Sequence, residues 1–398
     1  MNRRVNVIGV GLTPFTAFGA TSPYYALAAQ AGRLALQDAG IEFRQVEAAY
    51  AGFVYGDSIS GQRAIAELGL TGIPIINVAN HSASGSTALY LARQAIEHGI
   101  AECVLAVGFE QDLPEHCDRR WLDLQSPVAR HSRLILDRYP GETQVATQLF
   151  ASAASEYMKR YGTRAETLAM IAVKSREHAG RNPQALLRQA LSLEQVLAAE
   201  TVCAPLTRPQ CCVPACGAAA VLLCSDAFAR KHGIDNPVYI AAQAMATDLP
   251  STFNEGAAIK AVGYDQAFAA SRAVYERAGI GPEEVDVCEL HDCTSASELL
   301  LYEALGFCRE GGAEKLIEDG DNTYGGNCVI NPSGGLLSRG HPLGASGMAQ
   351  CVELVWHLRG SAGERQVSGA RIALQHNQSI GGACVVTMYR RDQAQGAV

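Results

Sequence analysis

Residues 77–89 have the sequence NVANHSASGSTAL, in which an apolar, strand-like run leads through small polar residues into a helix. Ser82 and Ser84 fall at the expected N-terminus of that helix. Unpaired backbone N–H groups and the positive end of the helix dipole face this position. Either serine could instead serve only as the N-cap of the helix. The segment predicts a strand–loop–helix unit with a polar site at its turn.

Two later segments also place reactive or glycine residues at the end of an apolar run. Residues 288–297 (CELHDCTSAS) put His291 and Cys293 directly after the run, where burial without partners would be costly. Residues 331–347 (NPSGGLLSRGHPLGASG) contain five glycines around His341. So many glycines before a helix indicate tight turns and a close approach of the backbone to another chain segment or a ligand.

A fourth segment closes the series near the C-terminus. Residues 374–386 (LQHNQSIGGACVV) end one strand at His376 and Asn377 and begin the next after Gly381 and Gly382. Adjacent glycines at such a place can direct backbone N–H groups at an oxyanion.

The chain as a whole alternates short apolar runs with helical stretches rich in Ala, Leu, Glu and Arg, which predicts an α/β fold with buried strands. The expected strands cover residues 5–10, 102–107, 218–224, 285–290 and 371–375. An internal duplication is also present, because residues 27–52 match residues 268–290 with the turns at Gly40 and Gly279 in step. A second match, between the segments that begin at Ser84 and Ala345, follows in the same order. The repeats predict two related halves.

The region between the halves fits neither repeat and is rich in Arg, His, Gln and Pro. The region begins where an expected strand ends. Ligands in α/β sheets bind beyond the carboxyl ends of the strands, so we expect the region to cover a site. The predicted domains are an N-terminal half (1–111 and 211–235), an inserted loop or lid region (112–210) and a C-terminal half (236–398).

Composition excludes several classes of protein. With 398 residues, 48% hydrophobic and 18% charged, the sequence describes a soluble chain with a large core. A net charge of -8 and the lack of a Lys/Arg-rich run argue against nucleic acid. No stretch approaches the roughly 20 apolar residues that span a bilayer, and the last residues match no peroxisomal or prenylation signal. We therefore expect a cytoplasmic protein with no membrane partner.

The 13 cysteines do not indicate a disulfide framework, because several lie in apolar runs where cysteine serves as a small hydrophobic residue. The four cysteines in apolar runs are Cys103, Cys224, Cys288 and Cys384. A second group clusters in sequence but lacks the paired CxxC spacing of zinc sites, so no metal is predicted. It consists of Cys203, Cys211, Cys212 and Cys216.

Taken in order, the four segments resemble the active-site loops of the thiolase superfamily, most of all its sterol-carrier-protein type. Residues 76–94 resemble that family's nucleophile loop, HDCTS its HDCF loop, GHPLGASG its GHP loop and HNQSIGGA its final glycine loop. Weaker likeness extends over nearly the whole chain. The resemblance implies the thiolase fold: two duplicated βαβαβαββ halves that form a five-layered αβαβα sandwich with an inserted loop domain.

The resemblance also implies roles for individual residues. Ser82 occupies the place of the cysteine that accepts the acyl group. His341 would activate this nucleophile and, with His291, bind a thioester oxygen, while Cys293 would move the proton on and off the attacking group. Backbone N–H groups of Ser82 and Gly381 would form a second oxyanion hole. The implied substrate- and coenzyme A-binding residues are Thr294, His376, Asn377, Ser379 and Gly382.

Departures from the family pattern gather near the chemistry. Ser82 is the most serious, because a thiolate is a ready nucleophile whereas a hydroxyl needs a general base. Four further positions also differ from the usual family residue: Cys216, Thr294, Gln378 and Ser379. The pocket is therefore not a standard one.

The function that the resemblance implies is a thiolase-like acyl-CoA acyltransferase of lipid metabolism, similar to acetyl-CoA acetyltransferase. It would act on a 3-ketoacyl-CoA or a related thioester, with coenzyme A thioester as substrate and no permanently bound cofactor. Three alternatives remain open: a cysteine-to-serine variant of an ordinary thiolase, a retro-aldol lyase on acyl-CoA side chains, and a non-catalytic acyl-CoA-binding subunit.

The resemblance further implies a homodimer or tetramer whose sheets pair through the strand at residues 102–107, and it admits a small zinc-ribbon/OB-fold partner protein. We also expect the phosphates of coenzyme A to lie against basic residues of the insertion. The candidates are Arg119, Arg120, Arg130, Arg133 and Lys174.

Overall fold

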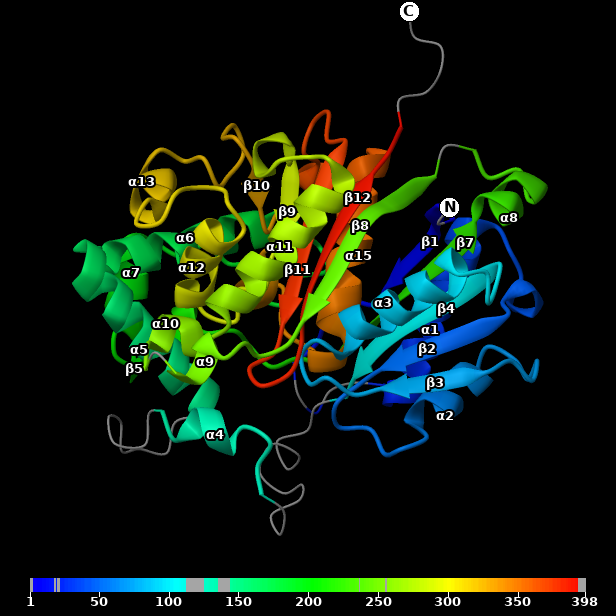
Figure 1. The fold of residues 1–398 in the computed structure, drawn as a ribbon, viewed down its shortest axis with the longest axis horizontal. Helices are drawn as coiled ribbons and strands as arrows, with labels where there is room; N and C mark the ends of the chain where they lie inside the picture. The colour runs from blue at the N-terminus through cyan, green and yellow to red at the C-terminus, as the bar shows by residue number, and fades with distance from the viewer. Residues whose placement is uncertain are drawn as a thin grey trace, which may run out of the picture.

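The computed structural model describes residues 3–17, 19, 22–111, 125–134, 144–235, 237–254 and 256–392. Within these ranges a ten-stranded sheet runs in the order β10-β9-β11-β12-β8-β1-β7-β4-β2-β3 (Figure 1). The strands of its N-terminal half are β1 (Val5–Leu12), β2 (Ala48–Gly52), β3 (Ile75–Val78), β4 (Cys103–Glu110) and β7 (Gly217–Ser225). Those of its C-terminal half are β8 (Val238–Ala246), β9 (Val287–Glu289), β10 (Val329–Ile330), β11 (Ile372–Gln378) and β12 (Cys384–Arg390). A separate two-stranded sheet pairs β5 (Thr201–Cys203) with β6 (Leu206–Thr207).

The two halves of the large sheet repeat one topology. Outward from the centre, the order β1, β7, β4, β2, β3 is matched by β8, β12, β11, β9, β10, so each strand has a counterpart in chain order. The parallel pairs of β2 with β3 and β4 correspond to those of β9 with β10 and β11. The duplication that the sequence predicts is therefore present in the strand order. The residue limits of the three domains stay a prediction.

Helices form layers around and between the two halves. In the middle, α3 (Ser84–Glu97) packs on α15 (Leu343–Arg359), and α15 contacts β4 and β7 on one side and β11 on the other. Outside the N-terminal half, α1 (Tyr24–Ala39) contacts β1 and β7, and α2 (Ser60–Ala66) packs on α1. Outside the C-terminal half, α11 (Tyr264–Ala278) contacts β8 and β12, and α12 (Ser295–Ala304) packs on α11. The expected αβαβα order of layers is confirmed.

The remaining helices lie mostly in the inserted region and in connections. Those of the inserted region are α4 (Ala129–Ser132), α5 (Val145–Tyr161), α6 (Ala165–Gly180) and α7 (Leu193–Leu197). Connecting helices are α8 (Asp226–Lys231), α9 (Ser251–Asn254), α10 (Ala258–Ala261), α13 (Ala313–Glu318) and α14 (Gly335–Ser338). Short 3₁₀ turns cover Phe43–Gln45, Arg208–Gln210, Pro282–Glu284 and Gly363–Arg365.

Glycines let the N-termini of α3 and α15 touch. A Cβ added at Gly85 would lie 2.5 Å from the carbonyl oxygen of Gly344, and one added at Gly347 would lie 2.1 Å from Ser86 Oγ. Both distances are far below van der Waals contact, so only glycine permits this approach. The contact brings together the loop that precedes α3 and the loop that precedes α15.

The predicted dimer contact through the strand at residues 102–107 is wrong. This strand is β4, and it pairs with β7 on one side and β2 on the other, so it has no free edge for another chain. Whether a strand is internal depends on distant partners and not on its own residues. In the part of the chain that the structure describes, β3 is the edge that stays open on this half. Among the described residues, no helix combines the length and the apolar character that crossing a membrane requires.

Candidate active site

The turn before α3 leaves the hydroxyl of Ser82 free of any capping role. Ser84 Oγ accepts the backbone N–H of Asn80 at 2.9 Å and donates to the carbonyl of His81 at 2.6 Å, so Ser84 braces the turn. Helix α3 begins after Ala83 without a side-chain cap. His81 has a φ of 50°, in the left-handed region that non-glycine residues rarely adopt.

Ser82 itself is only 6% exposed, and its Oγ lies 3.0 Å from Nδ1 of His81. Within the described ranges, the backbone N–H groups of Ser82 and Gly381 donate no hydrogen bond to the protein. Gly381 is left-handed with a φ of 68°, and a Cβ added at Gly382 would lie 3.3 Å from the carbonyl oxygen of Asn80. The glycine loop and the serine loop thus adjoin, and each presents an unused donor.

His291 is held as a hydrogen-bond donor. The side-chain amide of Asn377 donates to its Nδ1 at 3.0 Å, which places the proton of a neutral ring on Nε2. Burial, followed by the charges of His341, His376 and His81, holds the pKa of His291 well below 6.5. The ring is therefore neutral near pH 7, with Nε2–H as its remaining donor.

His341 has the opposite arrangement. Its Nδ1 lies 2.7 Å from Ser346 Oγ, and that hydroxyl donates to the carbonyl of Pro342 at 3.0 Å. Since a hydroxyl has one hydrogen, Nδ1 of His341 must donate to Ser346, which leaves a lone pair on Nε2. Burial, with smaller contributions from His81 and Arg339, lowers the pKa of His341 to about 3.

The two rings adjoin, because the centroids of His291 and His341 are 5.2 Å apart and the ring planes are 84° apart. His376 completes the group, since its Nδ1 accepts the backbone N–H of His291 at 3.5 Å. The donor of His291 and the acceptor of His341 therefore belong to adjacent rings. This pairing suits a carbonyl oxygen that gains negative charge and a proton that must be moved.

Cys293 and Thr294 lie on the same loop as His291 and have different roles. Burial, and next the neighbouring Cys212, raise the pKa of Cys293 far above its usual value, so it remains a protonated thiol. Thr294 is the N-cap of α12, because its Oγ accepts the backbone N–H of Ser297 at 3.1 Å. That contact gives Thr294 a structural task, and a role in substrate binding stays a prediction.

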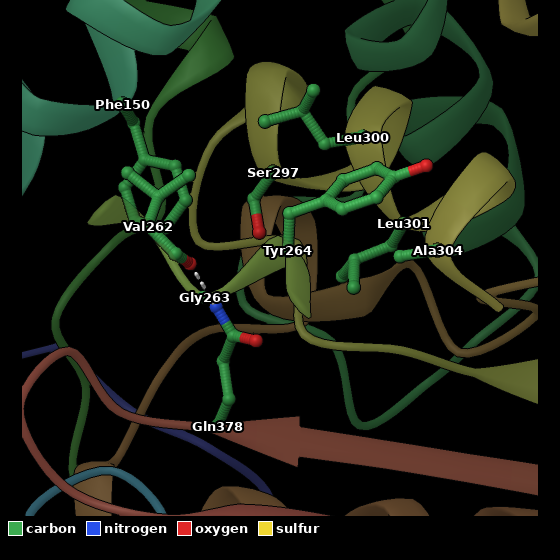
Figure 2. A pocket seen from close by; sticks show the side chains of 9 residues that line it. All are labelled: Phe150, Val262, Gly263, Tyr264, Ser297, Leu300, Leu301, Ala304 and Gln378. Atoms are coloured by element: carbon green, nitrogen blue, oxygen red, sulfur yellow. Dashed lines mark hydrogen bonds between the residues drawn. The ribbon is translucent and has the colours of Figure 1, made fainter. Parts of the chain in front are cut away.

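A small pocket lies behind the His291 loop (Figure 2). It has an empty volume of about 200 Å³. Ser297 connects it to the site by donating to the carbonyl of His291 at 2.6 Å, and Gln378 closes one side by donating to the carbonyl of Val262 at 2.7 Å. Its lining residues are Phe150, Val262, Gly263, Tyr264, Ser297, Leu300, Leu301, Ala304 and Gln378. Only Phe150 of these residues belongs to the inserted region.

The glycine loop next to the pocket is shaped by Ser379. Its backbone N–H donates to the carbonyl of Ala383 at 3.0 Å, which closes the turn that holds Gly381 and Gly382. The described part of the inserted region also reaches this loop. A Cβ added at Gly381 would lie 3.3 Å from Cε1 of His131, which is 2% exposed. That the insertion covers the site stays a prediction.

The expected basic residues for coenzyme A need correction. Lys174 is 6% exposed and forms a buried ion pair with Glu298, so its charge is used inside the protein and does not reach a phosphate. Arg119 and Arg120 lie outside the described residues. Arg130 is exposed and stacks on Phe253 with 3.8 Å between the guanidinium carbon and the ring centroid. Arg133 is also exposed.

His81 is a functional candidate that the sequence motifs do not single out. A histidine directly before a serine at a tight turn was the available signal, but only the backbone conformation shows that the ring turns back to the hydroxyl. In the described part of the chain, no group of three or more His, Cys, Asp or Glu side chains is placed to hold a metal ion.

Comparisons with known proteins show which family the chain resembles over nearly its whole length. The family description "Thiolase, N-terminal domain" matches residues 5–194, and "Thiolase C-terminal domain-like" matches residues 256–388. Sterol carrier protein 2 of Bos taurus is 51% identical over 394 residues, 98% of this chain and 73% of the relative. Acetyl-CoA acetyltransferase of Methanothermobacter thermautotrophicus is 35% identical over 98% of this chain and 100% of the relative. The solved structure of the Ltp2-ChsH2(DUF35) aldolase superposes with a TM-score of 0.83 at 23% identity, covering 99% of both chains, which shows a shared fold.

Proposed function

Because the chain belongs to the thiolase family and is an acyltransferase of that type, we propose that it acts on a 3-ketoacyl-CoA through an acyl group carried on Ser82. One observation carries the proposal. Within the described ranges, the backbone N–H groups of Ser82 and Gly381 are unused, and the adjacent neutral rings of His291 and His341 supply one donor and one acceptor. This set can serve two different carbonyl oxygens, as cleavage of a carbon–carbon bond next to a thioester requires.

In the cleavage direction, Ser82 Oγ attacks the 3-keto carbon while its proton passes to a base. The N–H groups of Ser82 and Gly381 stabilise the oxyanion that forms. The C2–C3 bond then breaks, which leaves the acyl group as an ester on Ser82 and the electron pair as an enolate of the shortened acyl-CoA. His291 donates to the enolate oxygen and the Cys293 thiol protonates the enolate carbon. A second coenzyme A then accepts the acyl group as a thioester.

The proposal is favoured over the three alternatives by the relative that is named as an acetyltransferase. The neighbour that is named as an aldolase is only 23% identical, so its activity does not transfer to this chain. The test is product analysis with acetoacetyl-CoA and coenzyme A. We expect acetyl-CoA from the protein and none from Ser82→Ala. Acetyl-CoA formation that survives in Ser82→Ala would contradict a role for this serine.

We further propose a cytoplasmic homodimer that pairs through β3. No described strand covers the outer edge of β3, and Ile76 on this strand is 44% exposed. Closed two-fold assembly is the commonest arrangement of soluble oligomers. Ile76→Lys should shift the sedimenting species from dimer to monomer, whereas Ile100→Lys, at an exposed position away from this edge, should not. A native protein that is already monomeric at micromolar concentration would contradict the proposal.

A small partner protein remains part of the proposal. Its support is the structural neighbour, whose name joins Ltp2 to ChsH2(DUF35). Copurification of a small protein with the tagged chain from its own host, at a fixed stoichiometry on gel filtration, is the expected result. A chain that reaches full activity alone would contradict a required partner.

A further inference from the structure

His81 is held against the nucleophile by an unfavourable backbone. Its φ of 50° is left-handed, and Asn331 is the other non-glycine residue in that region within the described ranges. Asparagine and histidine adopt this conformation more often than most non-glycine residues, but holding either there still costs on the order of 1 kcal/mol or more. The strained turn places Nδ1 of His81 3.0 Å from Ser82 Oγ. Strain that is kept beside a reactive group points to a function.

Among the described residues, the hydroxyl of Ser82 hydrogen-bonds the ring of His81 and not that of His341. Desolvation lowers the pKa of His81, so the ring is neutral near pH 7 and can accept a proton. The His81 side chain nevertheless keeps an exposed surface, whereas His341 is only 5% exposed. His81 can therefore exchange protons with water while its Nδ1 faces the buried serine.

An acyl group on oxygen differs chemically from one on sulfur. A thioester gains less resonance stabilisation than an ester, because overlap between the large sulfur orbitals and the carbonyl is poor. Acyl transfer from coenzyme A to Ser82 is therefore downhill, and return to a thiol is uphill. Water, by contrast, can take the acyl group downhill if a base stands beside it.

We propose that Ser82 and His81 form a nucleophile–base pair that hydrolyses acyl-CoA thioesters, so that water is an acceptor of the acyl group. Ser82 Oγ attacks the thioester carbon as its proton moves to His81 Nδ1, and the C–S bond breaks as that proton passes to the leaving sulfur. Water then attacks the Ser82 ester, again losing its proton to His81. The proton returns to Ser82 Oγ as the ester bond breaks, and the sum is acyl-CoA plus water giving a carboxylic acid and coenzyme A. This inference rests on the proposed function in one respect, the ability of Ser82 to carry an acyl group.

The experiment uses hexanoyl-CoA, which lacks a 3-keto group and so cannot undergo carbon–carbon cleavage. Release of the coenzyme A thiol is followed with a thiol reagent in ¹⁸O-enriched water, without added coenzyme A. We expect many thiols per protein chain and hexanoic acid that contains one ¹⁸O. Ser82→Ala should abolish the release. His81→Asn, which suits the left-handed backbone but removes the base, should slow it by about 10²-fold.

The matched control is His98→Asn. His98 is an exposed histidine at the opposite end of the same helix, so this variant should keep the wild-type rate. If His81→Asn does not fold, the pH dependence of the wild-type rate replaces it, because loss of the base predicts an acid limb with a midpoint below pH 6.5. A rate that does not fall between pH 8 and pH 4 would overturn the proposal.

The remaining outcomes separate this inference from the proposed function. One thiol per chain, with a stable hexanoyl ester on Ser82, would overturn hydrolysis and leave acyl transfer through Ser82 intact. No thiol release together with no acyl adduct, also with acetoacetyl-CoA, would overturn both. An undiminished rate in His81→Asn would show that hydrolysis does not use this pair.

Discussion

The turns before α3 and α15 are the same structural unit used for different chemistry. Each is a glycine-containing helix start, and the two starts touch at Gly85 and Gly347. The first turn presents Ser82 with His81, and the second presents His341. Duplication thus supplies two facing helix N-termini, of which one holds the nucleophile and the other a proton acceptor.

The corresponding strands β4 and β11 also end in residues with different roles. In the N-terminal half, β4 ends at Glu110, whose carboxylate accepts the backbone N–H groups of Val54, Tyr55 and Gly344 and so fixes loops. In the C-terminal half, β11 carries Asn377, which orients the ring of His291. One copy of the strand end is structural and the other serves the site.

The largest expected effect is the loss of the C-terminal histidines. His291→Ala should lower the rate of acetoacetyl-CoA cleavage by about 10² to 10³, because an oxyanion donor is lost. His341→Ala should cause a comparable loss, and His341→Asn should recover part of it if hydrogen bonding at this position suffices. Steady-state kinetics with matched thermal unfolding checks these values. Unchanged turnover in all three variants would mean that the histidines are structural.

The contact between the two helix starts can be broken from either side. Gly85→Ala and Gly347→Ala should each reduce the free energy of unfolding by about 1 to 3 kcal/mol, because the added Cβ would overlap neighbouring atoms. Gly180→Ala is the control, since its Cβ would lie 3.6 Å from the nearest atom, the carbonyl oxygen of Arg188. Urea denaturation measures all three. Equal stability of the three variants would contradict the close packing of the halves.

The nucleophile of the N-terminal turn can be improved. Ser82→Cys should raise thiolysis of acetoacetyl-CoA or a longer 3-ketoacyl-CoA by at least about tenfold, which is about 1.4 kcal/mol of barrier. The reason is that a thiolate attacks readily and returns its acyl group to a thiol without an energetic penalty. No gain with any 3-ketoacyl-CoA would indicate a pocket that has been rebuilt for another reaction.

The smallest expected effect is that of pH on the cleavage rate. The pKa of His341 is about 3, and the pKa of His81 is also lowered. Both rings therefore stay neutral at pH values where an ordinary histidine, with a pKa of 6.5, begins to be protonated. Since the neutral rings are the active forms, the rate should change less than about twofold between pH 8 and pH 6.5. A fall with a midpoint at or above pH 6.5 would contradict these shifts.

Much of this arrangement could be predicted from local sequence. The matching turns at Gly40 and Gly279 and the apolar runs are local signals, so the duplicated α/β fold followed from them. The positions of His291 and His341 followed from the resemblance of whole loops. In each case the information lies within a short segment.

The predictions that were wrong concern residues whose surroundings are set by distant parts of the chain. Lys174 was expected to reach a phosphate, but a charge in the sequence does not indicate burial, and Glu298 lies 124 residues away. Strand β4 was expected at a dimer edge, although strands from elsewhere in the chain cover both of its sides. His81 was missed because the direction of its ring depends on a left-handed backbone conformation that a short stretch of sequence does not reveal.

Acyl transfer through Ser82 is tested most simply by the intact mass of the protein quenched in acid within the first turnover of acetoacetyl-CoA. We expect a mass gain equal to one acetyl group, located on the peptide that contains Ser82 and absent from Ser82→Ala. An unmodified chain, or an acetyl group found on Cys293 instead, would contradict it.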